Sequence, residues 1–214
     1  MRTIIFANGM FNNPLRLPAL LRPDDILIAA DGGARHCRAL GLIPQVAIGD
    51  FDSLTEEELA ELSTLGAKII RHPQRKDYTD LELALDYALE QKPQEILIVG
   101  ALGLRWDQTL ANLLLPARCA AAKVRVCLLD GLQEIYLLVA GQTLVVNGQP
   151  GDTVSLIPIG GDAQGISTNG LEYPLKDETL YFGATRGVSN LLVNQKAQVT
   201  LRLGLLICVV IHQK

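Results

Sequence analysis

Short apolar runs alternate with helix-like periods from residue 1 to about residue 130. Apolar runs bounded by turn residues predict buried strands, which we place at residues 3–7, 25–30, 45–48, 67–71, 95–99 and 123–129. Apolar spacing and capping residues predict helices at residues 34–40 and 56–65, a third after Thr79, and a fourth near Asp107 with Leu110, Leu113 and Leu114 pointing inward. Six strands joined through helices by short loops predict an α/β fold, with a doubly wound, mostly parallel sheet and helices on both faces.

The pattern changes near Asp130-Gly131. From residue 134 onward no helical period is convincing, and β-rich segments lie at residues 142–146, 153–157, 179–182, 198–203 and 205–211. Turn signals separate them at Asn147-Gly148, Gly160-Gly161-Asp162, Asn169-Gly170 and Arg186-Gly187. We therefore predict two domains, residues 1–131 and residues 132–214, the second being a small all-β sandwich or barrel.

Composition and charge narrow the class of protein. Of the 214 residues 49% are hydrophobic and 20% charged, which predicts a folded globular chain. The net charge of −4 gives no general attraction for nucleic acid. The four cysteines form no C-x-x-C pair, we recognise no signal peptide, and the apolar runs 110–115 and 203–211 are too short to span a bilayer. We expect a cytoplasmic protein with reduced thiols and no membrane segment.

Two aspartates, Asp50 and Asp52, follow directly after the predicted strand 45–48. The carboxyl end of a parallel strand is where open α/β sheets hold ligands, and a spacing of two in extended chain puts both carboxylates on one side, with Phe51 pointing away. Like charges held close need a cation between them, and oxygen ligands suit Mg²⁺. An acidic loop in which Asp50 or Ser53 is only a turn or cap residue fits the same residues.

Other predicted strand ends carry similar polar groups. Asn8-Gly9 follows the first strand, and Asp31-Gly32-Gly33 lies between the second strand and a helix. Glycines at such a junction let a ligand approach the backbone, and the helix N-terminus favours an anion, although a Gly-Gly pair is also an ordinary tight turn.

Asp80 lies in the first turn of the helix that Thr79 and Glu82 begin with a capping box. The helix dipole alone would stabilise a carboxylate there. The carboxylate also follows a strand end, so that it would face the same sheet edge as Asp31, Asp50 and Asp52. Asp107 fits the N-cap of the fourth helix, and the neighbouring Arg105 fits a solvated charge.

Five segments taken together resemble the thiamine pyrophosphokinases. They are Ala30-Asp31-Gly32-Gly33-Ala34, Ile48-Gly49-Asp50-Phe51-Asp52-Ser53, Asp77-Tyr78-Thr79-Asp80, Gly103-Leu104-Arg105-Trp106-Asp107-Gln108-Thr109-Leu110-Ala111-Asn112 and Gly187-Val188-Ser189-Asn190. Each is modest alone, but five in family order, over nearly the whole chain and in the matching two-domain layout, are specific.

The resemblance implies transfer of an intact pyrophosphoryl group from ATP to the hydroxyl of thiamine, which gives thiamine diphosphate and AMP. It implies Mg²⁺ as cofactor, ATP as co-substrate, and a homodimer with a site shared between subunits. It makes residues 1–131 the nucleotide-binding catalytic domain and residues 132–214 the thiamine-binding and dimerisation domain.

Residue roles follow from the same likeness. The implied catalytic residues are Asp50, Asp52, Asp80 and Arg105, and the implied metal ligands are Asp31, Asp50, Asp52 and Asp80. The implied ATP-binding residues are Asn8, Gly9, Asp31, Gly32, Gly33, Thr79, Arg105 and Asp107, and the implied thiamine-binding residues are Asp77, Ser189 and Asn190. The chemistry agrees, because attack on the β-phosphorus of ATP meets heavy negative charge that Mg²⁺ and a guanidinium would neutralise.

Two positions depart from the family pattern, which usually has Gly at Leu104 and His at Gln108. Glutamine can form hydrogen bonds but cannot take up a proton as histidine does. These departures keep open an ATP-binding module without catalysis. A pyrophosphokinase that acts on a hydroxymethylpterin also stays open, because such related enzymes use a similar catalytic domain. Because thiamine is a cation it favours aromatic neighbours, and Tyr173, Tyr181 and Phe182 are the candidates in the second domain.

Overall fold

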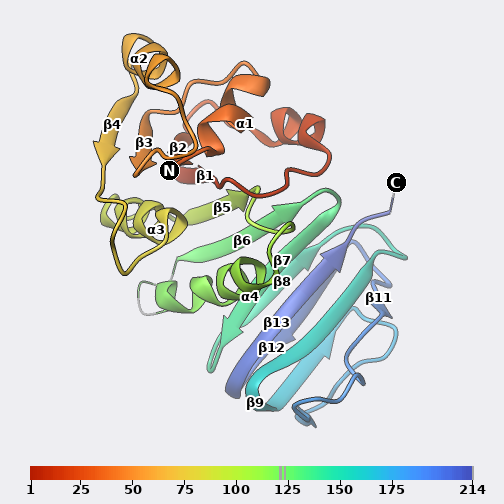
Figure 1. Cartoon of the computed structure of the whole chain (residues 1–214). Coiled ribbons are helices and arrows are strands. Elements are labelled where there is room, and N and C mark those ends of the chain that lie inside the picture. Colours follow the sequence, from red (N-terminus) through yellow and green to blue (C-terminus); the bar gives the residue numbers. More distant parts are fainter. Residues whose placement is uncertain (121, 123, 214) are drawn as a thin grey trace. The chain divides into compact units, whose positions relative to one another are not determined.

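A computed structural model of the chain describes residues 1–120, 122 and 124–213, apart from the side chain of residue 15 (Figure 1). The chain divides into two compact units, Met1–Gly131 and Leu132–Lys214. Among the described residues, no helix is long and apolar enough to cross a bilayer.

The first unit is built on six parallel strands. They are β1 (Arg2–Phe6), β2 (Ile26–Ala30), β3 (Val46–Gly49), β4 (Lys68–Arg71), β5 (Glu95–Val99) and β6 (Arg125–Asp130). All six match strands predicted from the sequence, but the predicted start of the last one, at Lys123, lies outside the described residues. β1 to β4 run outward in the order β4-β3-β2-β1, and β5 and β6 lie on the other side of β1. The order therefore reverses between β1 and β5, which is where parallel sheets open a ligand crevice at the carboxyl ends of their strands.

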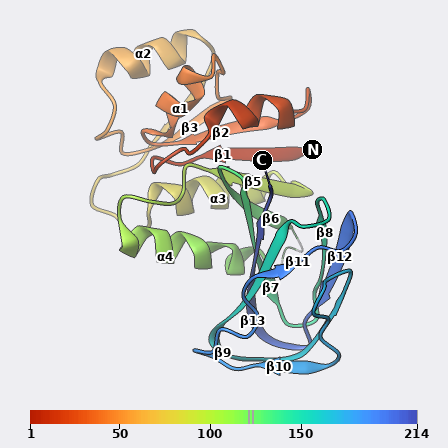
Figure 2. The same cartoon turned by 90° about the vertical axis from the view of Figure 1, so that its right-hand side faces the viewer.

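Helices connect these strands. They are the 3₁₀ helices η1 (Pro14–Leu20) and η2 (Leu115–Cys119), and the α-helices α1 (Gly33–Ala39), α2 (Glu56–Thr64), α3 (Asp80–Glu90) and α4 (Trp106–Leu114). Both α1 and α3 pack against β1 and β2, and Figure 2 shows them on opposite sides of β1. The α/β class predicted for this part of the chain is confirmed.

The capping prediction holds fully at one helix and partly at another. At α2 the Thr55 hydroxyl accepts a hydrogen bond from the Glu58 N–H, and the Glu58 carboxylate accepts one from the Thr55 N–H. At α3 the Thr79 hydroxyl accepts from the Glu82 N–H, but the Glu82 carboxylate is ion-paired with Arg118 instead. The second half of the predicted box is absent because a tertiary ion pair competes for that carboxylate.

The prediction that Leu110 and Leu114 of α4 point inward is wrong. Their side chains are 58% and 43% exposed, and within α4, all of whose residues are described, only Thr109 is buried. The helix turns its polar face toward the preceding loop, where the Thr109 hydroxyl accepts from the Gly103 N–H and the Asn112 amide donates to the Ala101 carbonyl. These hydrogen bonds set the rotation of the helix against its apolar period.

The second unit is all antiparallel β-structure. Its strands are β7 (Gln133–Val139), β8 (Thr143–Asn147), β9 (Thr153–Asn169), β10 (Glu178–Leu180), β11 (Asn190–Leu191), β12 (Lys196–Thr200) and β13 (Leu203–Ile211). β13 pairs with β7 and β9, and β12 pairs with β8 and β9. The β-rich character was predicted, whereas β7 and the short β11 were not.

The turn predicted at Gly160-Gly161-Asp162 is wrong, because β9 runs through it. Before this point β9 pairs with β13; after it the register with β13 shifts to the pair Leu203–Gln164, and β10 and β12 become further partners. Gly160 and Gly161 have φ values of +73° and +153°, and only glycine adopts both readily. The glycines therefore bend one strand between two sets of partners and do not end it.

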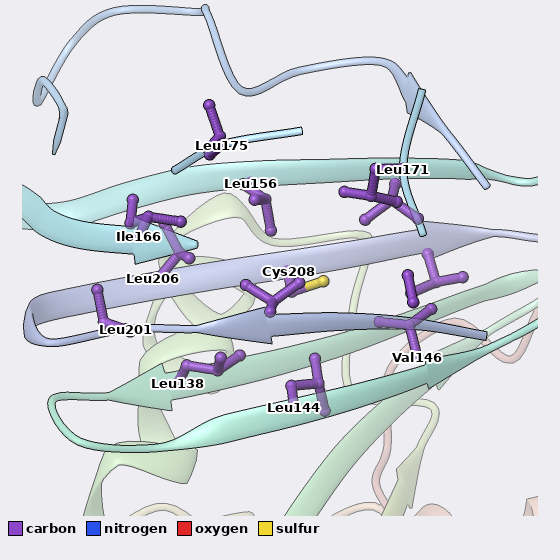
Figure 3. Packing of buried hydrophobic residues seen from close by; sticks show 14 of the residues in the cluster. Leu138, Leu144, Val146, Leu156, Ile166, Leu171, Leu175, Leu201, Leu206 and Cys208 are labelled. Atoms are coloured by element: carbon purple, nitrogen blue, oxygen red, sulfur yellow. The ribbon is translucent and has the colours of Figure 1, made fainter. Parts of the chain in front are cut away.

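One apolar core holds the second unit together (Figure 3). Alternate residues of β8 and β12 are buried, which is the period of a sheet with one face inward. Residues labelled in Figure 3 come from several strands and include Leu138, Leu144, Val146, Leu156, Ile166, Leu206 and Cys208. Burial raises the pKa of the Cys208 thiol to about 12, so that this cysteine is an inert core residue.

Candidate active site

A cleft of roughly 640 Å³ opens in the first unit at the carboxyl ends of β1, β2, β3 and β5. Most residues expected at the site line it. They are Asn8, Gly9, Asp31, Asp50, Asp52, Thr79, Asp80, Arg105 and Asp107, joined by Ser53, Gln74, Lys76, Tyr78, Gln108 and Asn112. The prediction that carboxylates from separate strand ends converge on one sheet edge is therefore met by the fold.

Asp31, Asp50 and Asp52 form the acidic centre of the cleft. One carboxylate oxygen from each lies within 4.8 Å of those of the other two. Asp31 is buried, and its Oδ1 atom has no hydrogen-bond partner among the described residues. A buried carboxylate oxygen without a partner is costly, so this atom is suited to a cation supplied from outside the chain.

The backbone explains how β2 and β3 present these side chains. Asp31 and Phe51 both have positive φ, +46° and +62°, which non-glycine residues adopt with strain. The Phe51 ring is buried in the core, as its expected direction away from the carboxylates requires. Anchored in this way, Phe51 turns Asp50 and Asp52 toward the cleft.

Asn8 and Ser53 connect the strand ends around this centre. The Asn8 amide donates to Asp31 Oδ2 at 3.2 Å and to Ser53 Oγ at 3.0 Å, and Ser53 Oγ donates to Asp52 Oδ1 at 3.2 Å. This chain of hydrogen bonds joins the ends of β1, β2 and β3. Sequence reasoning treated Ser53 only as a turn or cap residue, whereas its hydroxyl orients Asp52.

Gly32, Gly33 and Asp77 do not line the cleft. A Cβ on Gly32 would lie 2.3 Å from the Asn8 amide oxygen, and one on Gly33 would lie 2.0 Å from the Phe6 carbonyl oxygen. Gly33 is therefore required by the close approach of α1 to β1, whereas a side chain on Gly32 would displace the Asn8 amide. The structure explains this Gly-Gly pair without any approach of a phosphate.

Lys76 is a cleft residue to which sequence reasoning gave no role. Its Nζ atom lies 2.7 Å from Asp50 Oδ2 and 3.0 Å from Asp80 Oδ1. The hydrogen bond from Lys76 holds the pKa of Asp50 below its ordinary value, whereas burial raises the pKa of Asp80 despite the same neighbour. A lysine four residues before Asp80, among several acids, was the signal in the sequence that could have found it.

Arg105 and Asp107 form an exposed pair at the start of α4. The guanidinium donates two hydrogen bonds to the carboxylate, one of them from Nε to Oδ1 at 3.1 Å. This contact raises the pKa of Arg105 and lowers that of Asp107. Arg105 itself is the N-cap residue, so that Asp107 lies in the first turn and is not the cap.

The charges of the cleft are unbalanced. Among the described residues that line it, five carboxylates face two cationic side chains, Lys76 and Arg105. A polyphosphate would be repelled by this surplus unless a further cation entered with it.

The second unit holds the two other predicted residues. The Ser189 N–H donates to Ser155 Oγ at 3.0 Å, and Ser189 has a φ of +63°. The Asn190 amide is bound to the backbone of Tyr173. Three aromatic side chains of this unit are exposed: Tyr173, Tyr181 and Phe182.

Family models of known proteins match each of the two units separately. The family model described as "Thiamin pyrophosphokinase, catalytic domain" matches residues 17–128, and the one described as "Thiamin pyrophosphokinase, vitamin B1 binding domain" matches residues 142–206. A thiamine pyrophosphokinase of Bacillus subtilis is 31% identical over 98% of this chain and 98% of its own length.

Solved structures of the same family are also similar to this chain. The crystal structure of a thiamine pyrophosphokinase from Bacillus subtilis superposes with a TM-score of 0.89 at 27% identity, and covers 100% of both chains. That of a thiamin pyrophosphokinase from Geobacillus thermodenitrificans gives a TM-score of 0.86 at 26% identity, and covers 100% of this chain and 99% of the other.

Proposed function

Since the chain belongs to the thiamine pyrophosphokinase family, we propose that the acidic cleft of its first unit binds ATP and transfers the pyrophosphoryl group to thiamine. The thiamine hydroxyl oxygen forms a bond to the β-phosphorus, the bond from that phosphorus to the α-phosphate oxygen breaks, and AMP leaves. The proton of the hydroxyl passes to a carboxylate or to solvent. The observation that carries this proposal is the convergence of Asp31, Asp50 and Asp52 beside two cationic side chains.

The donor set of the cleft fits Mg²⁺. Asp31, Asp50 and Asp52 would hold it, since all three offer oxygen atoms and one of these is buried without a partner. When bound, the ion supplies the positive charge that the transferring phosphates require. Asp80 belongs to the same acidic edge, on the other side of Lys76 from Asp50.

Other cleft residues bind and orient ATP in this proposal. Arg105 neutralises the phosphates with a planar pair of donors, and Asp107 holds that guanidinium in place until the nucleotide arrives. Asn8, Gly9 and Thr79 line the wall around the acidic centre and contact the nucleotide. Gly32 and Gly33 support this wall indirectly, because Gly33 lets α1 lie close to β1 and Gly32 leaves room for the Asn8 amide.

The thiamine side and the assembly rest on the family resemblance. Asp77, Ser189 and Asn190 are the proposed thiamine-side residues, and the protein is proposed to be a cytoplasmic homodimer whose sites are shared between subunits. Residues 132–214 would bind thiamine and form the dimer, as a small β-sandwich or barrel. Residues 1–131 would form the doubly wound catalytic domain, which the reversal of strand order at β1 supports.

Incubation with ATP, Mg²⁺ and thiamine tests the reaction. We expect AMP and thiamine diphosphate in equal amounts, no ADP, and no product when EDTA replaces Mg²⁺. AMP formed with a hydroxymethylpterin and not with thiamine would contradict the proposed acceptor. Tight ATP binding without turnover on either alcohol would contradict catalysis.

Complementation tests the shared site. Asp52→Asn and Asn190→Ala chains are co-refolded and assayed with thiamine well below its KM, where each variant alone is expected to be nearly inactive. Random pairing makes about half of the dimers mixed, and a shared site leaves one of the two sites in each mixed dimer intact, so that about a quarter of wild-type activity returns. No recovery, with mixed dimers shown to be present, would place the whole site within one chain.

A further inference from the structure

Lys76 is held between two carboxylates inside the cleft. Its side chain is only 12% exposed, and its ammonium group contacts Asp50 on one side and Asp80 on the other. An ammonium group has three N–H donors, of which the hydrogen bond to Asp50 Oδ2 uses one, whereas the contact with Asp80 Oδ1 is an ion pair at 3.0 Å. Donors therefore remain for a ligand in the cleft that Lys76 lines.

Asp50 is shared between this lysine and the acidic centre. It belongs to the group with Asp31 and Asp52, and its Oδ1 accepts a hydrogen bond from the Asp52 N–H while Oδ2 accepts one from Lys76. Enzymes that use two metal ions place the second ion a few ångströms from the first, across a shared carboxylate. In this chain an ammonium group lies across the shared Asp50.

We propose that Lys76 is a second, protein-borne cation of the site, which contacts the β- or γ-phosphate of ATP, and that Asp80 is its positioning residue. The proposal rests on the function proposed above. The lysine adds a fixed positive charge on the phosphates that are transferred, and it exchanges no proton in the reaction.

The position of Lys76 differs from that of an ion pair that only stabilises the fold. Such a pair exists in Arg2 and Asp25, both buried, where the guanidinium closes the amino end of β1 with two hydrogen bonds to the carboxylate. Lys76 instead lies at the carboxyl ends of the strands, in the cleft with the surplus of carboxylates. Its placement is that of a ligand-facing cation.

Binding of two nucleotides tests this role without turnover. The probes are AMP, which lacks the β- and γ-phosphates, and α,β-methylene-ATP, which keeps them and cannot be cleaved at that position. In Lys76→Met we expect the affinity for α,β-methylene-ATP to fall at least about tenfold while that for AMP changes less than about twofold. Lys76→Arg should restore part of the loss, and Lys68→Met, which removes an exposed lysine of β4, should bind both nucleotides as the wild type does.

The affinities for both nucleotides are measured with Mg²⁺ and again in EDTA. Because Lys76 contacts the phosphates directly, its selective effect should persist in EDTA. Equal loss for both nucleotides, no loss, or a loss that disappears in EDTA would overturn the proposal. Thermal unfolding of each variant identifies a loss caused by misfolding.

Asp80→Asn separates positioning from metal binding. As a positioning residue for Lys76, Asp80 should give the same selective loss as Lys76→Met, smaller in size, with and without Mg²⁺. A loss confined to the Mg²⁺ experiment would show that Asp80 acts through the metal alone and would overturn its assignment as a positioning residue for Lys76. Failure of the proposed function would appear separately, as absence of AMP formation by the wild type with thiamine, whereas these binding measurements need no thiamine.

Discussion

The side-chain amide of Asn190 forms hydrogen bonds with both the N–H and the carbonyl of Tyr173. The amide oxygen of Asn190 accepts from the Tyr173 N–H at 3.0 Å, and its amide nitrogen donates to the Tyr173 carbonyl at 2.8 Å. The same oxygen accepts from the Leu191 N–H at 2.9 Å. The side chain therefore fixes the segment that carries an exposed tyrosine, and an effect of Asn190 on thiamine would act through that segment.

Asn190→Ala should release Tyr173. We expect faster hydrogen exchange at the Tyr173 N–H and a free energy of unfolding lower by about 1 kcal/mol, since three backbone groups lose their partner. The KM for thiamine should rise while that for ATP stays constant. Asn194→Ala, at an exposed asparagine after β11, is the control and should change neither quantity. Unaltered exchange at Tyr173 in Asn190→Ala would contradict the assignment.

Asp52→Asn should lose most turnover and keep the fold. The amide preserves shape but removes one of the three charges that would hold Mg²⁺, so that kcat should fall by at least about a hundredfold. Because Asp52 is exposed, the melting temperature should stay near that of the wild type. Asp24→Asn, at an exposed aspartate outside the cleft, is the matched control. A kcat within about threefold of the wild type would contradict the role of Asp52 in holding Mg²⁺ and would make it a turn residue only.

Arg105→Lys should impair the use of ATP although it keeps the charge. Lysine cannot reproduce the planar two-donor contact that Arg105 makes with Asp107 and that we assign toward phosphate. We expect kcat/KM for ATP to fall at least about tenfold, with stability unchanged. Arg38→Lys is the control, since Arg38 is also exposed and paired with a carboxylate, Glu61, at 3.2 Å. If both variants behave alike, Arg105 is a surface charge.

Leu104→Gly should stabilise the protein. Leu104 has a φ of +61° and is 80% exposed. Its backbone is therefore strained, and no burial of its side chain offsets that strain. Glycine relieves the strain but gains freedom in the unfolded chain, and we expect a net increase of about 0.5 kcal/mol in the free energy of unfolding by urea. Leu104→Val should be destabilising, because a branched side chain fits this conformation worse. A destabilised Leu104→Gly would show that the exposed leucine makes a stabilising contact.

Glu58 should make stability depend on pH below its ordinary pKa. Two hydrogen bonds from Arg35, both 2.9 Å, and one from the Thr55 N–H lower the pKa of Glu58 from 4.5 to about 2. A lowered pKa means that its contribution is complete above about pH 4.5 and is lost as the pH falls toward 2. Urea unfolding at pH 5 and pH 3 should show a larger loss for the wild type than for Glu58→Gln. Arg35→Met should reduce the loss in the same way, and equal losses in all three proteins would contradict this origin.

Local signals were enough for much of the site. Apolar runs and turn residues located the strands of the first unit, and the carboxyl ends of parallel strands share one edge, so that Asp31, Asp50 and Asp52 could be expected together. Burial of Phe51 was expected from the alternation of side chains along extended chain, but its φ of +62° is not that of extended chain, so that the turn and not the alternation sets its direction. The family was recognisable because its motifs lie in continuous segments.

Tertiary contacts decided the rest. No local pattern states that Lys76 reaches Asp50, 26 residues away, that Glu82 prefers Arg118 to its own helix cap, or that the Asn190 amide binds Tyr173. In each case the partner lies in another segment of the chain, and the packing of the two segments selects it. The same holds for α4, whose apolar period favours burial of Leu110, while the hydrogen bond that Thr109 accepts and the one that Asn112 donates turn it outward. Sequence thus determined which chemical groups meet at the sheet edge, and packing determined which charges face one another there.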